Sequence, residues 1–148
     1  MAYENLTDLN ISLDRYVATV EITRGPHNFF DMTLIRALAE AYEGLDSDPE
    51  CRAIVLCSQG KAFCAGANLG ARLDKDAGES REQSGQLYIE AVRLFRCHKP
   101  VVAAVQGAAV GGGLGLAMSA DFRVTCEEGR FSANFARLGF HHGFGLTV

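Results

Sequence analysis

Two short apolar runs, residues 53–57 and 100–105, are each followed closely by a segment of small residues. Apolar runs of this length, rich in β-formers, are typical of strands buried on both faces of a parallel sheet. The small residues occupy positions 62–69 after the first run and 107–116 after the second. Ligands of α/β proteins bind in loops beyond the carboxyl ends of such strands. Both segments are therefore candidate ligand loops.

The rest of the chain alternates between strand and helix patterns. Alternation of this kind indicates an α/β fold with mainly parallel pairing. The expected elements are a hairpin (10–13 and 16–22, turning at Asp14 and Arg15), helices (32–45 with Asp31 as N-cap, 84–95, and 114–120), extended segments (122–126 and Phe131) and a mobile, charged surface segment (74–82).

Length and composition limit the classes of function. The 148 residues are enough for a hydrophobic core, and we expect one domain over residues 1–148. A formal charge of −4 without a cluster of lysine and arginine argues against a nucleic-acid partner. The sequence shows neither a secretory signal nor an apolar run that could span a bilayer, so we expect no membrane partner and a cytoplasmic location. Five widely spaced cysteines without a CxxC motif predict reduced thiols and no metal site.

The second small-residue segment opens a predicted helix. Gly111, Gly112 and Gly113 lead into it. The first N–H groups of a helix have no partner within the helix, and the helix dipole favours a negative oxygen there. The segment lacks both the Gly-Lys-Ser/Thr of a phosphate loop and the third glycine of the dinucleotide fingerprint. Close helix–strand packing by small residues is the alternative explanation.

Taken together, the two segments resemble the signatures of the crotonase family, also called enoyl-CoA hydratase/isomerase. Residues 62–69 are similar to the family's Ala-Phe-x-Ala-Gly-Ala-Asp-Leu loop, with Asn68 in place of the usual aspartate. Residues 107–113 are similar to its Gly-x-x-x-Gly-Gly-Gly motif. The resemblance runs from about Ile11 to the chain end. It implies the N-terminal spiral of ββα units, with the family's C-terminal helical part missing, and therefore a truncated product or a fragment.

The resemblance also implies a site. The backbone N–H groups of Ala67 and Gly112 would form an oxyanion hole that polarises a thioester carbonyl and stabilises an enolate-like intermediate. Coenzyme A thioesters would be substrates, with no tightly bound cofactor. The residues implied to contact the coenzyme A arm or the acyl group are Arg24, Asn28, Phe29, Ala65, Gly66, Asn68, Leu69, Gly111 and Phe135.

Two positions depart from the family's hydratases, which use two glutamates as acid and base. Gly115 aligns with the first glutamate and Phe135 with the second, and neither can transfer a proton. Gly115 would leave room for a water or a small anion acting as base. His142, or its neighbour His141, is another candidate, because histidine titrates near neutral pH. The missing C-terminal part or a neighbouring subunit could also supply a base, since the family usually forms trimers or dimers of trimers.

The leading interpretation is an enzyme of the enoyl-CoA hydratase/isomerase type, a lyase or an isomerase of fatty acid metabolism that forms a homotrimer or hexamer. One alternative is a non-catalytic homologue that binds acyl-CoA and has lost its base. The other is an interaction or scaffold protein that uses the oligomer surface and has no affinity for coenzyme A.

Overall fold

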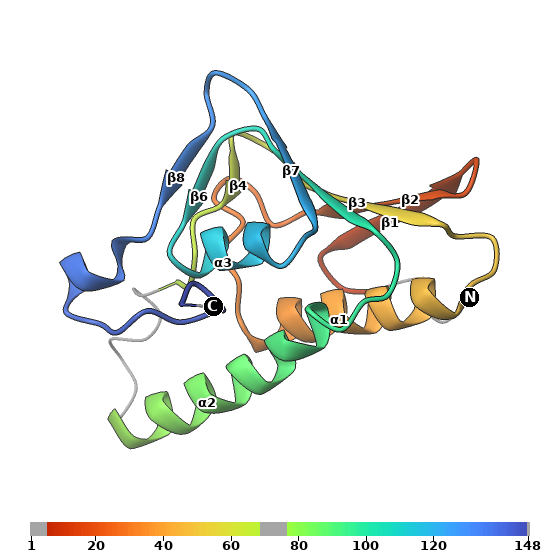
Figure 1. Ribbon diagram of the computed structural model, residues 1–148. Helices are drawn as coiled ribbons and strands as arrows, with labels where there is room; N and C mark the ends of the chain where they lie inside the picture. The colour runs from red at the N-terminus through yellow and green to blue at the C-terminus, as the bar shows by residue number, and fades with distance from the viewer. Residues whose placement is uncertain (1–5, 69–76, 148) are drawn as a thin grey trace.

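The structure, a computed structural model, describes residues 6–68 and 77–147 and contains two sheets (Figure 1). Except for the antiparallel β1–β2 hairpin, every pairing between the described strands is parallel, which confirms the expected α/β class. The larger sheet has the order β1 (Leu9–Asp14), β2 (Val17–Ile22), β3 (Ala53–Ser58), β5 (Val101–Val105) and β7 (Phe122–Thr125). The smaller sheet has the order β4 (Ala62–Cys64), β6 (Ala108–Val110) and β8 (Arg130–Ser132).

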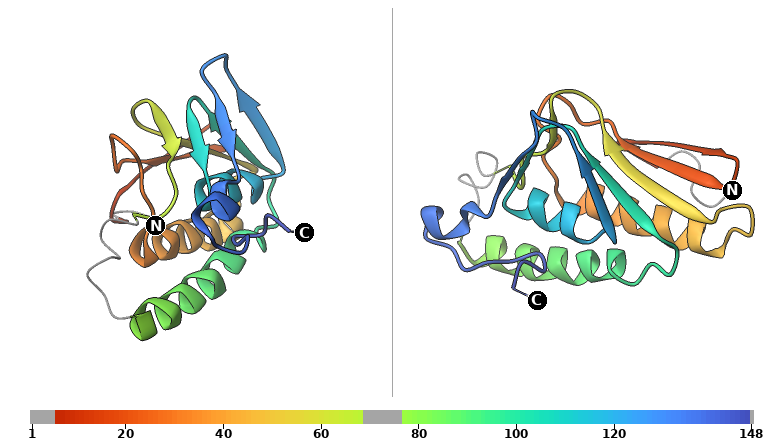
Figure 2. Two further views of the ribbon diagram at one scale, coloured as in Figure 1. Left: turned by 90° about the vertical axis from the view of Figure 1, so that its left-hand side faces the viewer. Right: turned by 45° about the horizontal axis from the view of Figure 1, so that its top comes forward.

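The helices are α1 (Met32–Ser47), α2 (Ala77–Leu94), α3 (Gly112–Met118) and the short 3-10 helix η2 (Asn134–Leu138). The two sheets diverge from a shared edge, with α3 between them and α1 and α2 side by side below (Figures 1 and 2). The chain passes three times from the larger sheet to the smaller, through β3–β4, β5–β6 and β7–β8. This path is the expected spiral of ββα units. In the described part of the chain, no helix combines the length and the apolar character that crossing a membrane requires.

Helix α1 supplies much of the hydrophobic core. Its predicted N-cap is confirmed, because Asp31 Oδ1 accepts a hydrogen bond of 3.0 Å from the Leu34 N–H. Its apolar residues recur at three- and four-residue spacing and face alternate, inward-pointing residues of the larger sheet. The fully buried contributors include Leu34, Leu38 and Leu45 from the helix and Val20, Ile54, Leu56 and Ala103 from the strands.

Two strands were not expected from the sequence. Residues 62–69 were predicted to be a loop, but residues 62–64 form β4. Residues 108–110, also expected to lie outside any strand, form β6. Strands of three residues are too short to show an alternating pattern, and their alanines carry little hydrophobic signal.

Three further predictions differ in their boundaries. Helix α3 covers Gly112–Met118 rather than residues 114–120. Helix α2 begins at Ala77 rather than at residue 84, so residues 77–82 of the segment predicted to be mobile lie in a helix. Residues 74–76 lie outside the described residues. The hairpin is confirmed, but its turn lies one position later than expected, at Arg15 and Tyr16, which have φ values of 44° and 68°. Positive φ at both central residues is the geometry that matches the twist of a two-residue hairpin.

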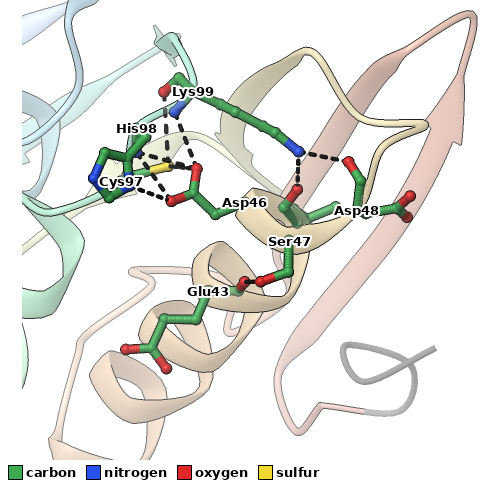
Figure 3. A network of polar contacts seen from close by, with 8 residues as sticks. Glu43, Asp46, Ser47, Asp48, Cys97, His98 and Lys99 are labelled. Carbon is green, nitrogen blue, oxygen red and sulfur yellow. Dashed lines mark hydrogen bonds and ion pairs between the residues drawn. The ribbon is translucent and has the colours of Figure 1, made fainter.

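Asp46, near the carboxyl end of α1, connects this helix to the loop between α2 and β5 (Figure 3). Its carboxylate accepts hydrogen bonds of 3.1 Å from the backbone N–H groups of His98 and Lys99, and the His98 Nδ1 lies 2.8 Å away. Lys99 Nζ donates to the carbonyl oxygens of Leu45 and Asp48. Cations are favoured at this end of a helix. Burial raises the pKa of the Asp46 carboxyl, but the hydrogen bonds from His98 and Lys99 outweigh burial and hold it below the ordinary value of 3.8.

We expect Asp46→Asn to lower the free energy of unfolding by about 2 kcal/mol, because hydrogen bonds to a charged group contribute more than neutral ones. Chemical denaturation at neutral pH measures the loss. The stabilisation from Asp46 is complete above the ordinary carboxyl pKa and is lost as the pH falls through the lowered folded-state pKa. The stability of wild type and variant should therefore converge in acid. Glu40→Gln, at an exposed position of the same helix, is the control.

Candidate active site

Strands β4 and β6 bring the two small-residue segments together. They pair in parallel, with Ala62 opposite Ala108 and Cys64 opposite Ala109, so their carboxyl ends meet at one edge of the smaller sheet. Beyond that edge the backbones touch. A Cβ placed on Gly66 would lie 2.8 Å from the Val110 carbonyl oxygen and 3.8 Å from the Gly112 nitrogen. Gly66 has φ +89°, a conformation that also favours glycine.

Ala67 and Gly112 lie on either side of this contact. Ala67 forms an isolated parallel bridge with Phe30, whose N–H donates to the Gly66 oxygen at 3.0 Å. Gly112 is the first residue of α3, so its N–H has no partner within the helix. Among residues 6–68 and 77–147, the N–H groups of Ala67 and Gly112 form no hydrogen bond with another protein group. Two adjacent loops therefore each carry an available backbone donor.

The glycines at the start of α3 also serve close packing, the alternative drawn from the sequence. A Cβ on Gly113 would lie 2.0 Å from the Cys64 carbonyl oxygen, so the helix rests directly on the end of β4. A Cβ on Gly112 would lie 2.4 Å from the Phe30 ring. The two explanations of the glycines are therefore compatible, because close packing is what brings the N–H of Gly112 beside the first loop.

Asn28 and Arg24 hold the loop that carries Phe30. Asn28 is fully buried, and its Nδ2 donates to the carbonyl oxygens of Gln59 at 2.7 Å and Ala62 at 2.8 Å. Its Oδ1 accepts a bond from the Arg24 N–H at 3.1 Å. A side chain without exposed surface positions the loop rather than touching a ligand, which differs from the expectation for Asn28.

The Arg24 guanidinium lies between two carboxylates. Its Nε is 2.6 Å from Asp8 Oδ2 and its Nη1 is 2.9 Å from Asp31 Oδ1. Nη1 also donates to the Phe29 carbonyl oxygen at 3.2 Å. The ring of Phe29, half-buried, lies 5.3 Å from the ring of His27. Arg24 thus neutralises charges within the protein, and the geometry gives it a clear role in fixing this loop.

Of the remaining predicted residues, Ala65, Asn68 and Gly111 lie along the same two loops. Ala65 is half-buried, and its N–H donates to the His27 oxygen at 3.0 Å. Asn68 is exposed, and Leu69 lies outside the described residues. Gly111 is buried at φ +56°, with Asn134 Oδ1 2.9 Å and the Phe135 ring 3.7 Å from the position of a Cβ. Phe135 on η2 therefore lies beside the second loop.

Gly115 does not leave the expected space for a water or an anion. A Cβ there would lie 2.5 Å from both the Cβ and the carbonyl oxygen of Phe144. That expectation was wrong because Phe144, which was not predicted to lie here, fills the position. The available signal was an aromatic residue between two glycines, Gly143 and Gly145.

Three titratable side chains lie near the loops. His141 and His142 are exposed, and the His142 ring lies edge-on to Phe135 with 5.9 Å between centroids. His141 Nδ1 is 2.8 Å from the His142 carbonyl oxygen. Burial raises the pKa of the Cys64 thiol to about 11, so this cysteine is protonated at neutral pH. Within the described residues, no group of three or more potential ligands is placed to hold a metal ion.

Residues 13–148 match the family described as enoyl-CoA hydratase/isomerase. The chain is 37% identical to a Mycobacterium tuberculosis (strain ATCC 25618 / H37Rv) protein named "Probable enoyl-CoA hydratase EchA14", over 93% of this chain and 54% of that protein. It is 33% identical to crotonyl-CoA hydratase of Syntrophomonas wolfei, over 99% of this chain and 56% of that one.

The fold is also similar to solved structures. A crystal structure of an enoyl-CoA hydratase from Shewanella pealeana ATCC 700345 superposes with a TM-score of 0.82 at 29% sequence identity. That match covers 94% of this chain and 54% of the other. The chain thus spans about half the length of the curated relatives it matches.

Proposed function

The chain belongs to the enoyl-CoA hydratase/isomerase family, and we propose that it binds a coenzyme A thioester with the carbonyl oxygen between the N–H groups of Ala67 and Gly112. The observation that carries the proposal is the contact of the two loops. The Gly66 backbone lies against Val110 and Gly112, and each loop presents an N–H that no other protein group in the described residues accepts.

Two such donors suit the chemistry of a thioester. Removing a proton from the carbon next to the carbonyl, or adding to a conjugated double bond, moves negative charge onto the carbonyl oxygen. Fixed N–H groups stabilise that charge without having to reorient during the reaction. The amino-terminal end of α3 adds a favourable dipole at Gly112. We propose that the reaction is that of a lyase or an isomerase and proceeds through this enolate-like intermediate.

We further propose that His142 supplies proton transfer. The side chain lies against Phe135, the position that aligns with the second glutamate of the family's hydratases. Its imidazole is exposed, so a bound ligand can reach the ring nitrogens.

The two loops and residues 24–31 are proposed to line the coenzyme A arm and the acyl group. Residues 1–148 are proposed to act as one acyl-CoA-binding domain, in a cytoplasmic homotrimer or hexamer without a tightly bound cofactor. The proposed contacts are Arg24, Phe29, Ala65, Gly66, Asn68, Leu69, Gly111 and Phe135, with Asn28 as the buried support of the loop.

A second candidate function is acyl-CoA binding without catalysis. The observation that favours it is the residue at the first glutamate position, because Gly115 offers no acid or base and Phe144 occupies the space that a side chain would need. The alternatives differ in turnover and not in binding.

Calorimetry with acetyl-CoA and turnover assays with a panel of enoyl-CoA and β-ketoacyl-CoA esters test the proposal. We expect saturable binding together with turnover of at least one ester, and a large loss of turnover in His142→Ala. Saturable binding without any turnover would support the second candidate. Failure to bind any ester would contradict both functions and leave the scaffold alternative. His98→Ala, at an exposed histidine whose ring contacts Asp46 near the carboxyl end of α1, is the matched control.

A further inference from the structure

Phe144 is a buried aromatic residue in an unusual backbone conformation. It is only 4% exposed, and its φ is +57°. A bulky residue at positive φ is uncommon and is maintained only where its surroundings hold it. The two neighbouring glycines place the backbone of residues 143–145 against α2 and Phe95, the residue that follows it. A Cβ on Gly143 would lie 2.4 Å from the Tyr88 hydroxyl, and one on Gly145 would lie 2.8 Å from the Phe95 ring.

The Phe144 side chain is held from two further directions. Its ring lies 5.4 Å from the Phe30 ring at 55°, and 6.5 Å from the Tyr88 ring at 80°. These are tilted and edge-on arrangements that aromatic pairs favour. Phe30 comes from the loop that bridges to Ala67, and Tyr88 comes from α2. Phe144 therefore fills the space between α2, α3 and the segment 24–31 that carries Phe30.

The same side chain covers the first turn of α3. A Cβ on Gly112 would lie 3.5 Å from the Phe144 Cδ2, and a Cβ on Gly115 would lie 2.5 Å from the Phe144 Cβ. Phe144 thus extends from the proposed oxyanion donor to the position of the first family glutamate. These two residues are three apart, which along a helix is about 4.5 Å. Gly115 and Phe144 are complementary in size, because any side chain at position 115 would collide with Phe144.

We propose that Phe144 is the specificity-determining residue of the acyl pocket and restricts this site to short acyl groups. The inference rests on the proposed function. An acyl chain that leaves a carbonyl held at Gly112 and runs along α3 meets Phe144 within one helical turn, the length of about four carbon atoms. Longer acyl chains would have to displace a buried ring that three elements hold in place.

The test is calorimetry with butyryl-CoA and octanoyl-CoA, unreactive saturated esters that differ only in chain length. The wild-type chain should bind butyryl-CoA at least about tenfold more tightly, because the additional methylenes find no pocket. Phe144→Ala should raise affinity for octanoyl-CoA at least about tenfold and change affinity for butyryl-CoA little. Phe144→Leu keeps more of the packing and should raise the affinity for octanoyl-CoA by an intermediate factor. If the alanine variant does not fold, this variant tests the role of Phe144 in chain-length preference.

Phe140→Ala is the matched control, since Phe140 is a nearby aromatic residue that is 56% exposed. It should leave the preference for chain length unchanged. Equal binding of both esters by wild type, or an equal change for both esters in the Phe144 variants, would overturn the inference and leave the proposed function intact. No binding of any ester by the folded wild-type chain would instead overturn the proposed function, and the inference with it.

Discussion

Replacing the backbone N–H of Ala67 with an ester oxygen is expected to lower kcat/KM for an acyl-CoA substrate about 100- to 1,000-fold. Incorporation of lactic acid at position 67 makes this change and keeps the methyl side chain. The loss is large because a fixed donor in an oxyanion hole acts where charge develops. Steady-state kinetics measure it.

A matched variant controls for a side effect of the ester. The Gly66 carbonyl becomes a weaker acceptor, and it accepts the Phe30 N–H at 3.0 Å. Phenyllactic acid at position 30 removes that same hydrogen bond and leaves the Ala67 N–H in place. We expect this control to lose stability with a much smaller loss of kcat/KM. Similar losses of kcat/KM in both variants would show that catalysis depends on the hydrogen bond between Phe30 and Gly66 and not on the Ala67 N–H.

If the chain has no turnover, the same two ester variants test the Ala67 donor through binding affinity. The wild-type chain should bind a butyryl thioester more tightly than the corresponding S-butyl thioether, which lacks the carbonyl oxygen. The ester at position 67 should remove most of that preference, since one of the two donors is gone. If the ester variant kept the full preference for the thioester over the thioether, the carbonyl oxygen would not be bound at the Ala67 N–H.

Gly113→Ala is expected to lower the free energy of unfolding by about 3 kcal/mol or more, and it can prevent folding altogether. The added Cβ would lie 2.0 Å from the Cys64 carbonyl oxygen and 2.7 Å from its carbonyl carbon. Both are backbone atoms, so relief requires moving β4 away from α3, and overpacking of this kind is costly. Urea denaturation followed by circular dichroism measures the change.

Gly85→Ala is the matched control for Gly113→Ala. Gly85 lies within α2, and nothing lies within 4 Å of the position that its Cβ would take. Alanine is the better helix former, so this variant should be more stable by about 0.5–1 kcal/mol. If both variants changed stability equally, the close contact between β4 and α3 would not be a determinant of the fold.

The elements with strong local patterns could be predicted from the sequence. Helix α1 was predicted from its apolar spacing and from Asp31, and strands β3 and β5 from their apolar runs. Strands β4 and β6 were missed because a run of three residues is too short to carry a periodic signal. Their pairing depends on the larger sheet, which sets the two chain segments side by side. The start of α2 was missed because residues 77–82 are mostly polar and include Gly78.

Apart from the spiral of ββα units, which the resemblance to the crotonase family implied, the sequence by itself determined the α/β class and the two small-residue loops that carry Ala67 and Gly112. Both follow from short-range patterns, namely buried strands that end in small residues and glycines that open a helix. Only the tertiary structure decided what surrounds those donors. Asn28 became a buried support because its amide reaches carbonyl groups on another segment. Position 115 has no room for a ligand because Phe144, which is distant in sequence, packs against α3 there and is held by contacts with Phe30 and Tyr88. Such contacts depend on the packing of separate elements, which no local pattern encodes.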